Sequence, residues 1–166
     1  MAADLDAEKK LAADAAAELI EDGMAVGLGT GSTVAHLLPA IAARQLKNLR
    51  CVATSVATEE QGKALGIPVE PFDQLDRLDI AIDGADQIAP DRWLVKGGGG
   101  AHTREKIAAS SAERFVVIAD YRGEVRDPAE LAARLAPIPG VVDHGLFPAE
   151  MVAEVLIGRG GSVERS

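Results

Sequence analysis

The residue types best suited to chemistry gather in one short stretch, Lys96 to Lys106, which reads KGGGGAHTREK. Glycine accepts backbone angles that other residues avoid and lets a ligand approach the main chain. The residues after the glycines are typical of a first helical turn, where unpaired N–H groups favour anions. An ammonium at Lys96 and a carboxylate at Glu105 would then flank one small, anion-tolerant pocket. The alternative is a flexible turn followed by an ordinary helix start.

These residues suggest proton transfer next to a developing negative charge. Lys96 could neutralise an anion or an oxyanion, and Glu105 could act as a general base if partial burial raises its pKa towards neutrality. The backbone amides of Gly97, Gly98 and Gly99 would be preorganised donors beside that charge. Glutamate at a helix start is also ordinary dipole chemistry, so Glu105 alone would not decide the matter.

A second glycine-rich stretch, Gly29-Thr30-Gly31-Ser32-Thr33, follows a short apolar segment. Its G-x-G-x-G spacing differs from the dinucleotide fingerprint, and no Walker lysine follows it, so a dinucleotide site is not expected. The hydroxyl groups and the amides of a helix start suit one phosphate monoester instead. The alternative is a tight turn from strand to helix with Ser or Thr as the cap.

A third candidate is the pair of carboxylates Asp83 and Asp86, three residues apart at the predicted tip of a strand. They could share protons, orient sugar hydroxyls or hold a divalent cation, although Asp-Gly also makes good turns. No further cluster of Asp, Glu or His lies nearby in sequence, so we expect no metal site. Of the scattered histidines, only His102 adjoins a candidate motif, and we expect it to be a bystander.

Composition excludes several classes of function. The chain has 166 residues, a net charge of −9 and only 3% aromatic residues, so phosphate neutralisation and base stacking of nucleic acids are not expected. No long apolar run predicts a membrane span, and the N-terminus does not resemble a signal peptide, so a cytoplasmic location follows by default. A single cysteine, Cys51, excludes an internal disulfide, and we expect it to be a buried small hydrophobe.

The elements that must position these motifs alternate between strands and helices. Periodicity and capping signals predict helices over 5–22, 32–45, 58–65, 104–112 and 127–135, the last with Asp127 as N-cap and Pro128 at N1. Apolar runs predict strands over 24–29, 49–53, 78–83, 114–119 and 154–157, with extended pieces over 67–70, 93–95 and 141–147 and a polar tail at the end. This alternation predicts an α/β fold with a doubly wound, mostly parallel, Rossmann-like sheet, formed by residues 1–166 as a single compact domain. Such sheets bind ligands at the strand tips.

The segments GLGTGSTV (27–34), LDIAIDGAD (78–86) and KGGGGAHTREKIAA (96–109) together resemble ribose-5-phosphate isomerase of type A, in that family's order. Weaker similarity runs from Lys9 to Asp120 and returns over 127–147. The resemblance implies an aldose–ketose isomerase of the non-oxidative pentose phosphate pathway. It would interconvert ribose 5-phosphate and ribulose 5-phosphate through an enediolate, without a metal or organic cofactor.

The resemblance also implies roles for individual residues. Glu105 would be the base that moves the proton between C2 and C1, and Lys96 would stabilise the oxyanion. Asp83 and Asp86 would assist ring opening and proton movement at the hydroxyls. The residues implied in phosphate binding are Gly29, Thr30, Gly31, Ser32 and Thr33, with Lys9 reaching over from the first helix.

The chain departs from the family pattern in several places. After Asp120 the family continues with Ser-Lys, whose lysine helps to cover the phosphate, whereas this chain has Tyr121-Arg122-Gly123, with Arg122 as the candidate substitute. Gln87 stands where the family has Glu, and His102 where it has Leu. Family members carry a small α+β lid domain between the strand at 114–119 and the last helix, where only Tyr121 to Arg126 connect these elements here.

We therefore expect a single domain without the lid, and a more open pocket that could accept a different sugar phosphate. The alternatives to the ribose-5-phosphate reaction are an isomerase of another phosphorylated sugar and a non-catalytic sugar-phosphate-binding or regulatory protein. The retained carboxylates and Lys96 favour an enzyme, because binding alone would not need a base. Since α/β subunits of this size often pair, we expect a homodimer.

Overall fold

The fold is taken from a computed structural model that describes residues 2–120 and 126–166, with side chains from residue 5 onward. The helices are α1 (Ala2–Ala17), α2 (Ser32–Ala43), α3 (Val56–Ala64), α4 (His102–Ser111) and α5 (Pro128–Leu135), with 3₁₀ turns η1 (Phe72–Gln74) and η2 (Ala149–Met151). The strands are β1 (Ala25–Leu28), β2 (Arg50–Ala53), β3 (Val69–Glu70), β4 (Leu78–Gly84), β5 (Gln87–Ile88), β6 (Leu94–Val95), β7 (Ala112–Ala119), β8 (Leu146–Phe147), β9 (Glu154–Arg159) and β10 (Ser162–Arg165).

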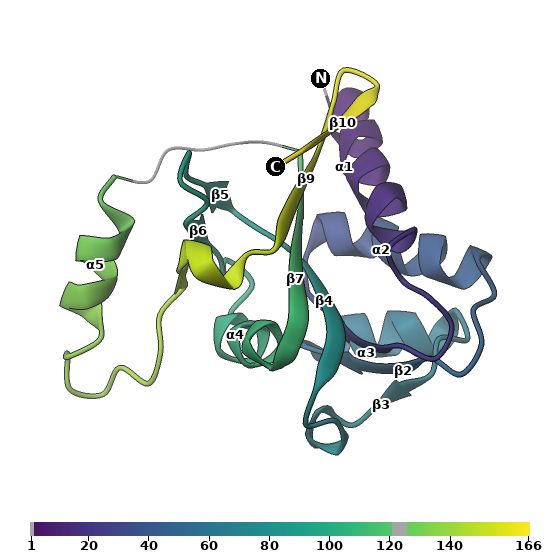
Figure 1. Ribbon diagram of the computed structural model, residues 1–166, viewed down its shortest axis with the longest axis horizontal. Helices are drawn as coiled ribbons and strands as arrows, with labels where there is room; N and C mark the ends of the chain where they lie inside the picture. The colour runs from purple at the N-terminus through teal and green to yellow at the C-terminus, as the bar shows by residue number, and fades with distance from the viewer. Residues whose placement is uncertain (1, 121–125) are drawn as a thin grey trace.

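Within these residues, seven strands form a central sheet in the order β10-β9-β7-β4-β1-β2-β3 (Figure 1). The neighbouring strands run parallel, except that β10 is antiparallel to β9. The chain enters at β1, adds β2 and β3 on one side, and then places β4 on the other side of β1. The prediction of a doubly wound, mostly parallel α/β sheet is confirmed. Because the winding reverses between β1 and β4, their carboxyl ends open a crevice, which is where such sheets bind ligands.

Each face of the sheet is covered by its own layer of side chains. Helices α1 and α2 pack on one face, where Leu37 and Ile41 meet Ile80 and Ile82 of β4. Helix α4 and the small sheet β5-β6-β8 pack on the other face (Figure 1). The core is almost entirely aliphatic, as predicted, and within the described parts of the chain its one aromatic pair is Phe115 with Phe147, on the second face.

The first helix ends at Ala17, before the predicted end at Asp22. At this end Arg44, which follows α2, donates hydrogen bonds from its guanidinium to the carbonyl groups of Ala17 and Ile20. Carbonyls at a helix end lack partners within the helix, and these bonds supply donors from outside it. Ile20 then turns into the core, and Gly23, at a φ of 82°, completes the turn into β1.

Three further predictions are corrected by the structure. The polar tail forms β10, because Gly160 and Gly161 both adopt positive φ and close a hairpin with β9. The segment 141–147 is extended as a strand only at β8, which joins β5 and β6 in a separate sheet. Asp127 lies in the left-handed region and its side chain caps nothing, whereas Pro128 does occupy the first turn of α5.

Among the described residues, the structure contains no helix with the length and hydropathy needed to cross a bilayer.

Gly158 allows α1 to lie directly against β9. A Cβ atom at this position would lie 1.9 Å from the main-chain oxygen of Glu8, so any side chain would push the helix away from the sheet. We expect Gly158→Ala to lower the free energy of unfolding by about 2–3 kcal/mol, measured by urea denaturation. Ser162→Ala, at an exposed position in β10, is the control. Equal unfolding midpoints for both variants would contradict this account.

Candidate functional site

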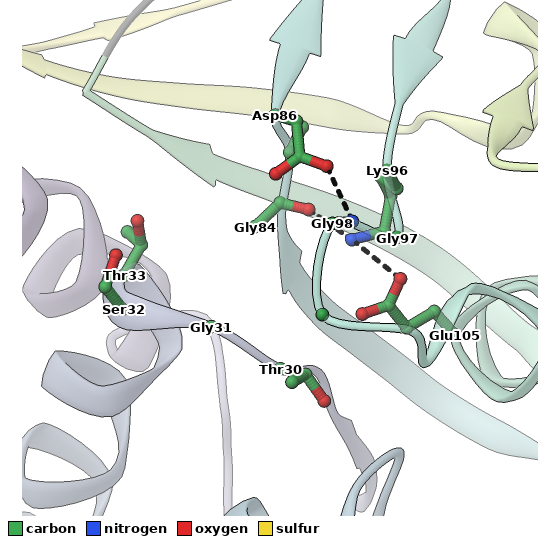
Figure 2. Close-up of a pocket in the computed structure, with 12 residues that line it drawn as sticks. Thr30, Gly31, Ser32, Thr33, Gly84, Asp86, Lys96, Gly97, Gly98 and Glu105 are labelled. Carbon is green, nitrogen blue, oxygen red and sulfur yellow. Dashed lines mark hydrogen bonds and ion pairs between the residues drawn. The ribbon is translucent and has the colours of Figure 1, made fainter.

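A cavity of about 120 Å³ opens in the crevice beyond β1 and β4. Its lining comes from three segments, Thr30–Thr33, Gly84–Asp86 and Lys96–Gly99, together with Glu105. Figure 2 shows these segments converging from the start of α2, the end of β4 and the loop into α4. The three motifs singled out in the sequence therefore meet at one place.

Lys96 is the centre of a buried group of charges. Its Nζ lies 3.0 Å from Oδ2 of Asp83 and 3.4 Å from Oε2 of Glu105, and it also donates to the carbonyl of Gly84. The three charged residues are each at most 6% exposed. One ammonium thus faces two carboxylates in a region that water scarcely reaches.

Asp83 is the better stabilised of the two carboxylates. Its Oδ1 accepts hydrogen bonds from the N–H groups of Thr30, at 3.0 Å, and Gly84, at 2.7 Å. Burial raises the pKa of this carboxyl, while Lys96 and the two N–H donors oppose the increase. Gly29 makes this arrangement possible, because a Cβ there would lie 2.1 Å from the Asp83 carboxylate.

Glu105 has fewer hydrogen-bond donors around it than Asp83. Burial, followed by the nearby charge of Asp83, raises its pKa to about 7, with Lys96 acting against the increase. Its Oε2 is buried and accepts no hydrogen bond from the described residues. A carboxylate with this pKa can take up and return a proton near neutral pH.

The glycine run connects Asp86 to the start of α4. Gly98 donates its N–H to Oδ2 of Asp86 at 3.0 Å, the contact drawn in Figure 2. Gly97 and Gly100 adopt φ values of 100° and 78°, and the N–H of Gly100 returns to the carbonyl of Gly97. At Gly97 a Cβ would also lie 2.6 Å from that of His102, so the turn requires glycine there.

The loop at the start of α2 is held by hydrogen bonds with Thr54, which follows β2, and Thr58 of α3. The hydroxyls of Thr30 and Thr54 lie 2.8 Å apart, and Thr58 donates its hydroxyl to the carbonyl of Gly29 at 2.8 Å. Gly31, the N-cap of α2, offers no side-chain hydrogen bond. The first N–H groups of α2, at Ser32 and Thr33, are therefore suited to an anion in the cavity.

Not every predicted site residue lines the cavity. Gly29 and Asp83 lie beneath it, and Lys9 pairs with Asp120 at 3.7 Å near the end of β7. Sequence reasoning passed over the lining residues Gly84 and Ala85 and the contact of Thr54 with Thr30. The candidate substitute Arg122, with Tyr121 and Gly123, lies outside the described residues. Within the described part of the chain, no group of three His, Cys, Asp or Glu side chains could hold a metal ion.

Comparison with known proteins identifies the family. The family model described as ribose 5-phosphate isomerase A (phosphoriboisomerase A) matches residues 50–127. Ribose-5-phosphate isomerase A of Caulobacter vibrioides is 36% identical over 222 aligned positions, which cover 96% of this chain and 97% of the relative. The chain belongs to the ribose 5-phosphate isomerase A family. The resemblance seen in the sequence motifs is confirmed.

Solved structures of the ribose 5-phosphate isomerase family share the fold. The enzyme of Neisseria gonorrhoeae superposes with a TM-score of 0.89 at 26% identity, covering 97% of this chain and 96% of that one. A D-ribose-5-phosphate isomerase in complex with phospho-erythronic acid has a TM-score of 0.87 at 26% identity and covers 95% of this chain and 96% of its own. The α/β architecture is therefore that of the family.

The charge group predicts how Glu105 titrates. We expect one glutamate carboxyl, absent from Glu105→Gln, to titrate near pH 7 in ¹³C NMR spectra. Glu70 is the internal control, because hydrogen bonds from Arg50 lower its pKa. A Glu105 signal that titrates in the ordinary range of glutamate would contradict the burial of its charge.

The same pKa predicts a pH dependence of stability. Because the folded-state pKa of Glu105 lies above the unfolded value, the native state holds its proton more tightly, and wild-type stability falls as pH rises through about 7. The substitution Glu105→Gln removes this loss of stability, because glutamine does not titrate. Its free energy of unfolding relative to wild type should rise between pH 5 and pH 8 by on the order of 1–2 kcal/mol, measured by urea denaturation.

Proposed function

We propose that this protein interconverts ribose 5-phosphate and ribulose 5-phosphate by proton transfer through an enediolate. The observation that carries the proposal is the buried group of Asp83, Lys96 and Glu105, in which a carboxyl of pKa about 7 lies beside an ammonium. Membership of the ribose 5-phosphate isomerase A family supports the choice of substrate.

The proton moves between two neighbouring carbons. In the open-chain aldose, Glu105 takes the proton from C2, the electron pair forms the C1–C2 double bond, and the charge moves to O1. The ammonium of Lys96 stabilises that oxyanion. Glu105 returns the proton to C1 while the O2 proton passes to O1, which leaves a ketone at C2 and an alcohol at C1.

Asp83 and Asp86 take different parts in this scheme. Both oxygens of Asp83 are engaged, by two N–H groups and by Lys96, so it acts by holding the ammonium in place. Asp86 is exposed and lines the cavity, which suits it to assist ring opening and proton movement at the sugar hydroxyls. The backbone of Gly97, Gly98 and Gly99 lines the side of the cavity where the oxyanion forms.

The phosphate binds at the start of α2. Gly31, Ser32 and Thr33 offer N–H groups and two hydroxyls to it at the positive end of the helix. The N–H of Thr30 is bonded to Asp83, so Thr30 would bind the phosphate through its hydroxyl, which also contacts the hydroxyl of Thr54. Lys9 would have to leave Asp120 to reach the phosphate.

We also infer a single domain without the family's lid. The alignment with the Caulobacter relative has 222 positions against 166 residues in this chain, so it contains gaps in this chain. In the sequence, residues 120–127 are all that separates β7 from α5, at the place where the lid domain is expected. A pocket without that roof would be more open to larger sugar phosphates.

A homodimer acting in the cytoplasm is the assembly we propose. Helix α5 lies apart from both layers of the sheet (Figure 1), and it and the following segment expose Leu131, Ile138 and Val142 at 38%, 46% and 90%. So short a helix is unstable in water without a partner for its apolar face. A second copy of the chain would supply that partner.

Turnover tests the function directly. Purified protein treated with a chelator should interconvert ribose 5-phosphate and ribulose 5-phosphate, and Glu105→Gln should lower kcat by about 100-fold or more with little change in binding. Glu113→Gln, an exposed carboxylate of β7, is the matched control and should stay close to wild type. Binding without turnover would instead support a non-catalytic sugar-phosphate-binding protein. A panel of four- to six-carbon sugar phosphates tests whether another substrate is preferred.

The phosphate loop should affect binding more than chemistry. We expect Ser32→Ala to raise KM about 10-fold with kcat nearly unchanged, because a hydrogen bond to the phosphate is made equally in the ground and transition states. Ser110→Ala, at an exposed position of α4, is the control. If Ser32→Ala lowered kcat and left KM unchanged, the phosphate would have to bind elsewhere.

A further inference from the structure

The segment 143–147, which lies between α5 and η2, supports the charged site from outside the cavity. We propose that Lys106 and Asp143 are positioning residues that lock this segment against α4 and so hold Glu105 and Lys96 at their working separation. Neither residue lines the cavity, so each acts through others. The inference rests on the proposed isomerase function and adds two residues to its machinery.

The lock itself is a set of short hydrogen bonds. Nζ of Lys106 donates to Oδ1 of Asp143 and to the carbonyl of His144, both at 2.6 Å. Oδ1 of Asp143 also accepts from the N–H of His144 at 2.7 Å. Burial alone would raise the pKa of Asp143, but the bonds from Lys106 and His144 lower it, so the carboxylate is charged at neutral pH. The two locking side chains are mostly buried, at 16% and 24% exposure, so the pair is sheltered from water.

The same segment fixes the main chain at Lys96. The N–H of Lys96 donates to the carbonyl of Gly145 at 2.8 Å, next to the antiparallel pairing of β6 with β8. The contact is so close that a Cβ on Gly145 would lie 2.1 Å from the carbonyl oxygen of Lys96. The position of residue 145 therefore sets the position from which the Lys96 side chain departs.

One aromatic ring lies beneath both ammonium groups. Phe147 is fully buried, and its ring centroid lies 5.6 Å from Nζ of Lys96 and 4.9 Å from Nζ of Lys106. The ring is itself packed against Phe115 of β7, with 6.2 Å between the centroids. Cations are attracted to the face of such a ring, and more so where water is excluded. The ring of Phe147 thus gives Lys96 and Lys106 one shared, buried packing surface.

Helix α4 gains from Lys106 an anchor that its N-cap does not supply. Four glycines precede it, and its N-cap, Ala101, makes no side-chain hydrogen bond. Oε2 of Glu105 accepts no hydrogen bond from the described residues, and Lys96 lies 3.4 Å away. Lys106 is the next residue along the helix, so its bonds restrain the turn that carries the base. A misplacement of about 1 Å at such a base can lower a rate by up to 10²-fold.

The experiment compares Lys106→Met, Asp143→Ala and the double variant with wild type in ribose 5-phosphate turnover. We expect each single variant to lower kcat about 10-fold while KM stays within about 3-fold, because the phosphate loop is untouched. The double variant should be no slower than the slower single variant by more than about 2-fold, since both break one lock. Lys106→Arg, which keeps the charge and the donors, should recover most of the loss.

Arg104→Met is the matched control. Arg104 is an exposed cation in the same helical turn, over the ring of Phe72, and among the described residues it forms no hydrogen bond or ion pair with the segment 143–147. Its kcat should remain within about 2-fold of wild type. Thermal unfolding of every variant separates a loss of fold from a loss of positioning, and Asp143→Ala provides the test if Lys106→Met does not fold.

The outcomes distinguish this inference from the function on which it rests. If wild type shows no turnover, the proposed function is wrong. If wild type turns over ribose 5-phosphate and the folded single variants keep its kcat, the lock is wrong and the function stands. Additive losses in the double variant, or an equal loss in Arg104→Met, would also overturn the lock.

Discussion

The structure of the site depends on one buried ammonium placed between two buried carboxylates. A single positive charge cannot balance two buried carboxylates. The other groups around each carboxylate therefore decide how well its charge is stabilised. Asp83 receives Lys96 and two backbone N–H groups and becomes the anchor. Glu105 lies farther from the ammonium, at 3.4 Å, and has a pKa of about 7. Burial and, after it, the nearby charge of Asp83 raise the pKa of Glu105 and suit this residue to the proposed role of base.

The fold produces this arrangement by reversing its winding between β1 and β4. The reversal brings the loop after β1 beside the tip of β4, so that the N–H of Thr30 reaches the carboxylate of Asp83. Gly29 allows that approach because it has no side chain. In the proposed mechanism, phosphate binding and the stabilisation of the Asp83 charge thus share one loop, so a change in the loop would disturb both.

The second face of the sheet holds the site together. The small sheet β5-β6-β8 carries Lys96 at the end of β6 and Phe147 in β8, beneath the ammonium groups of Lys96 and Lys106. Helix α4 closes the arrangement through the bonds from Lys106 to the segment 143–147. The small sheet, helix α4 and the segment 143–147 come from different parts of the chain. Together they pack around the ion pair of Lys96 with Glu105.

The sequence by itself determined the features that are encoded locally. Alternating apolar runs and caps predicted the α/β class, and the glycine spacing with Lys96, Glu105, Asp83 and Asp86 predicted the candidate site and its chemistry. Only the tertiary structure decided the burial of Lys96, the hydroxyl contact of Thr30 with Thr54, the pairing of Lys9 with Asp120, and the end of α1 beneath Arg44. The physical reason is that periodicity and spacing report on neighbours along the chain. The pKa of Glu105 and the lock at Lys106 arise from groups that meet only after folding.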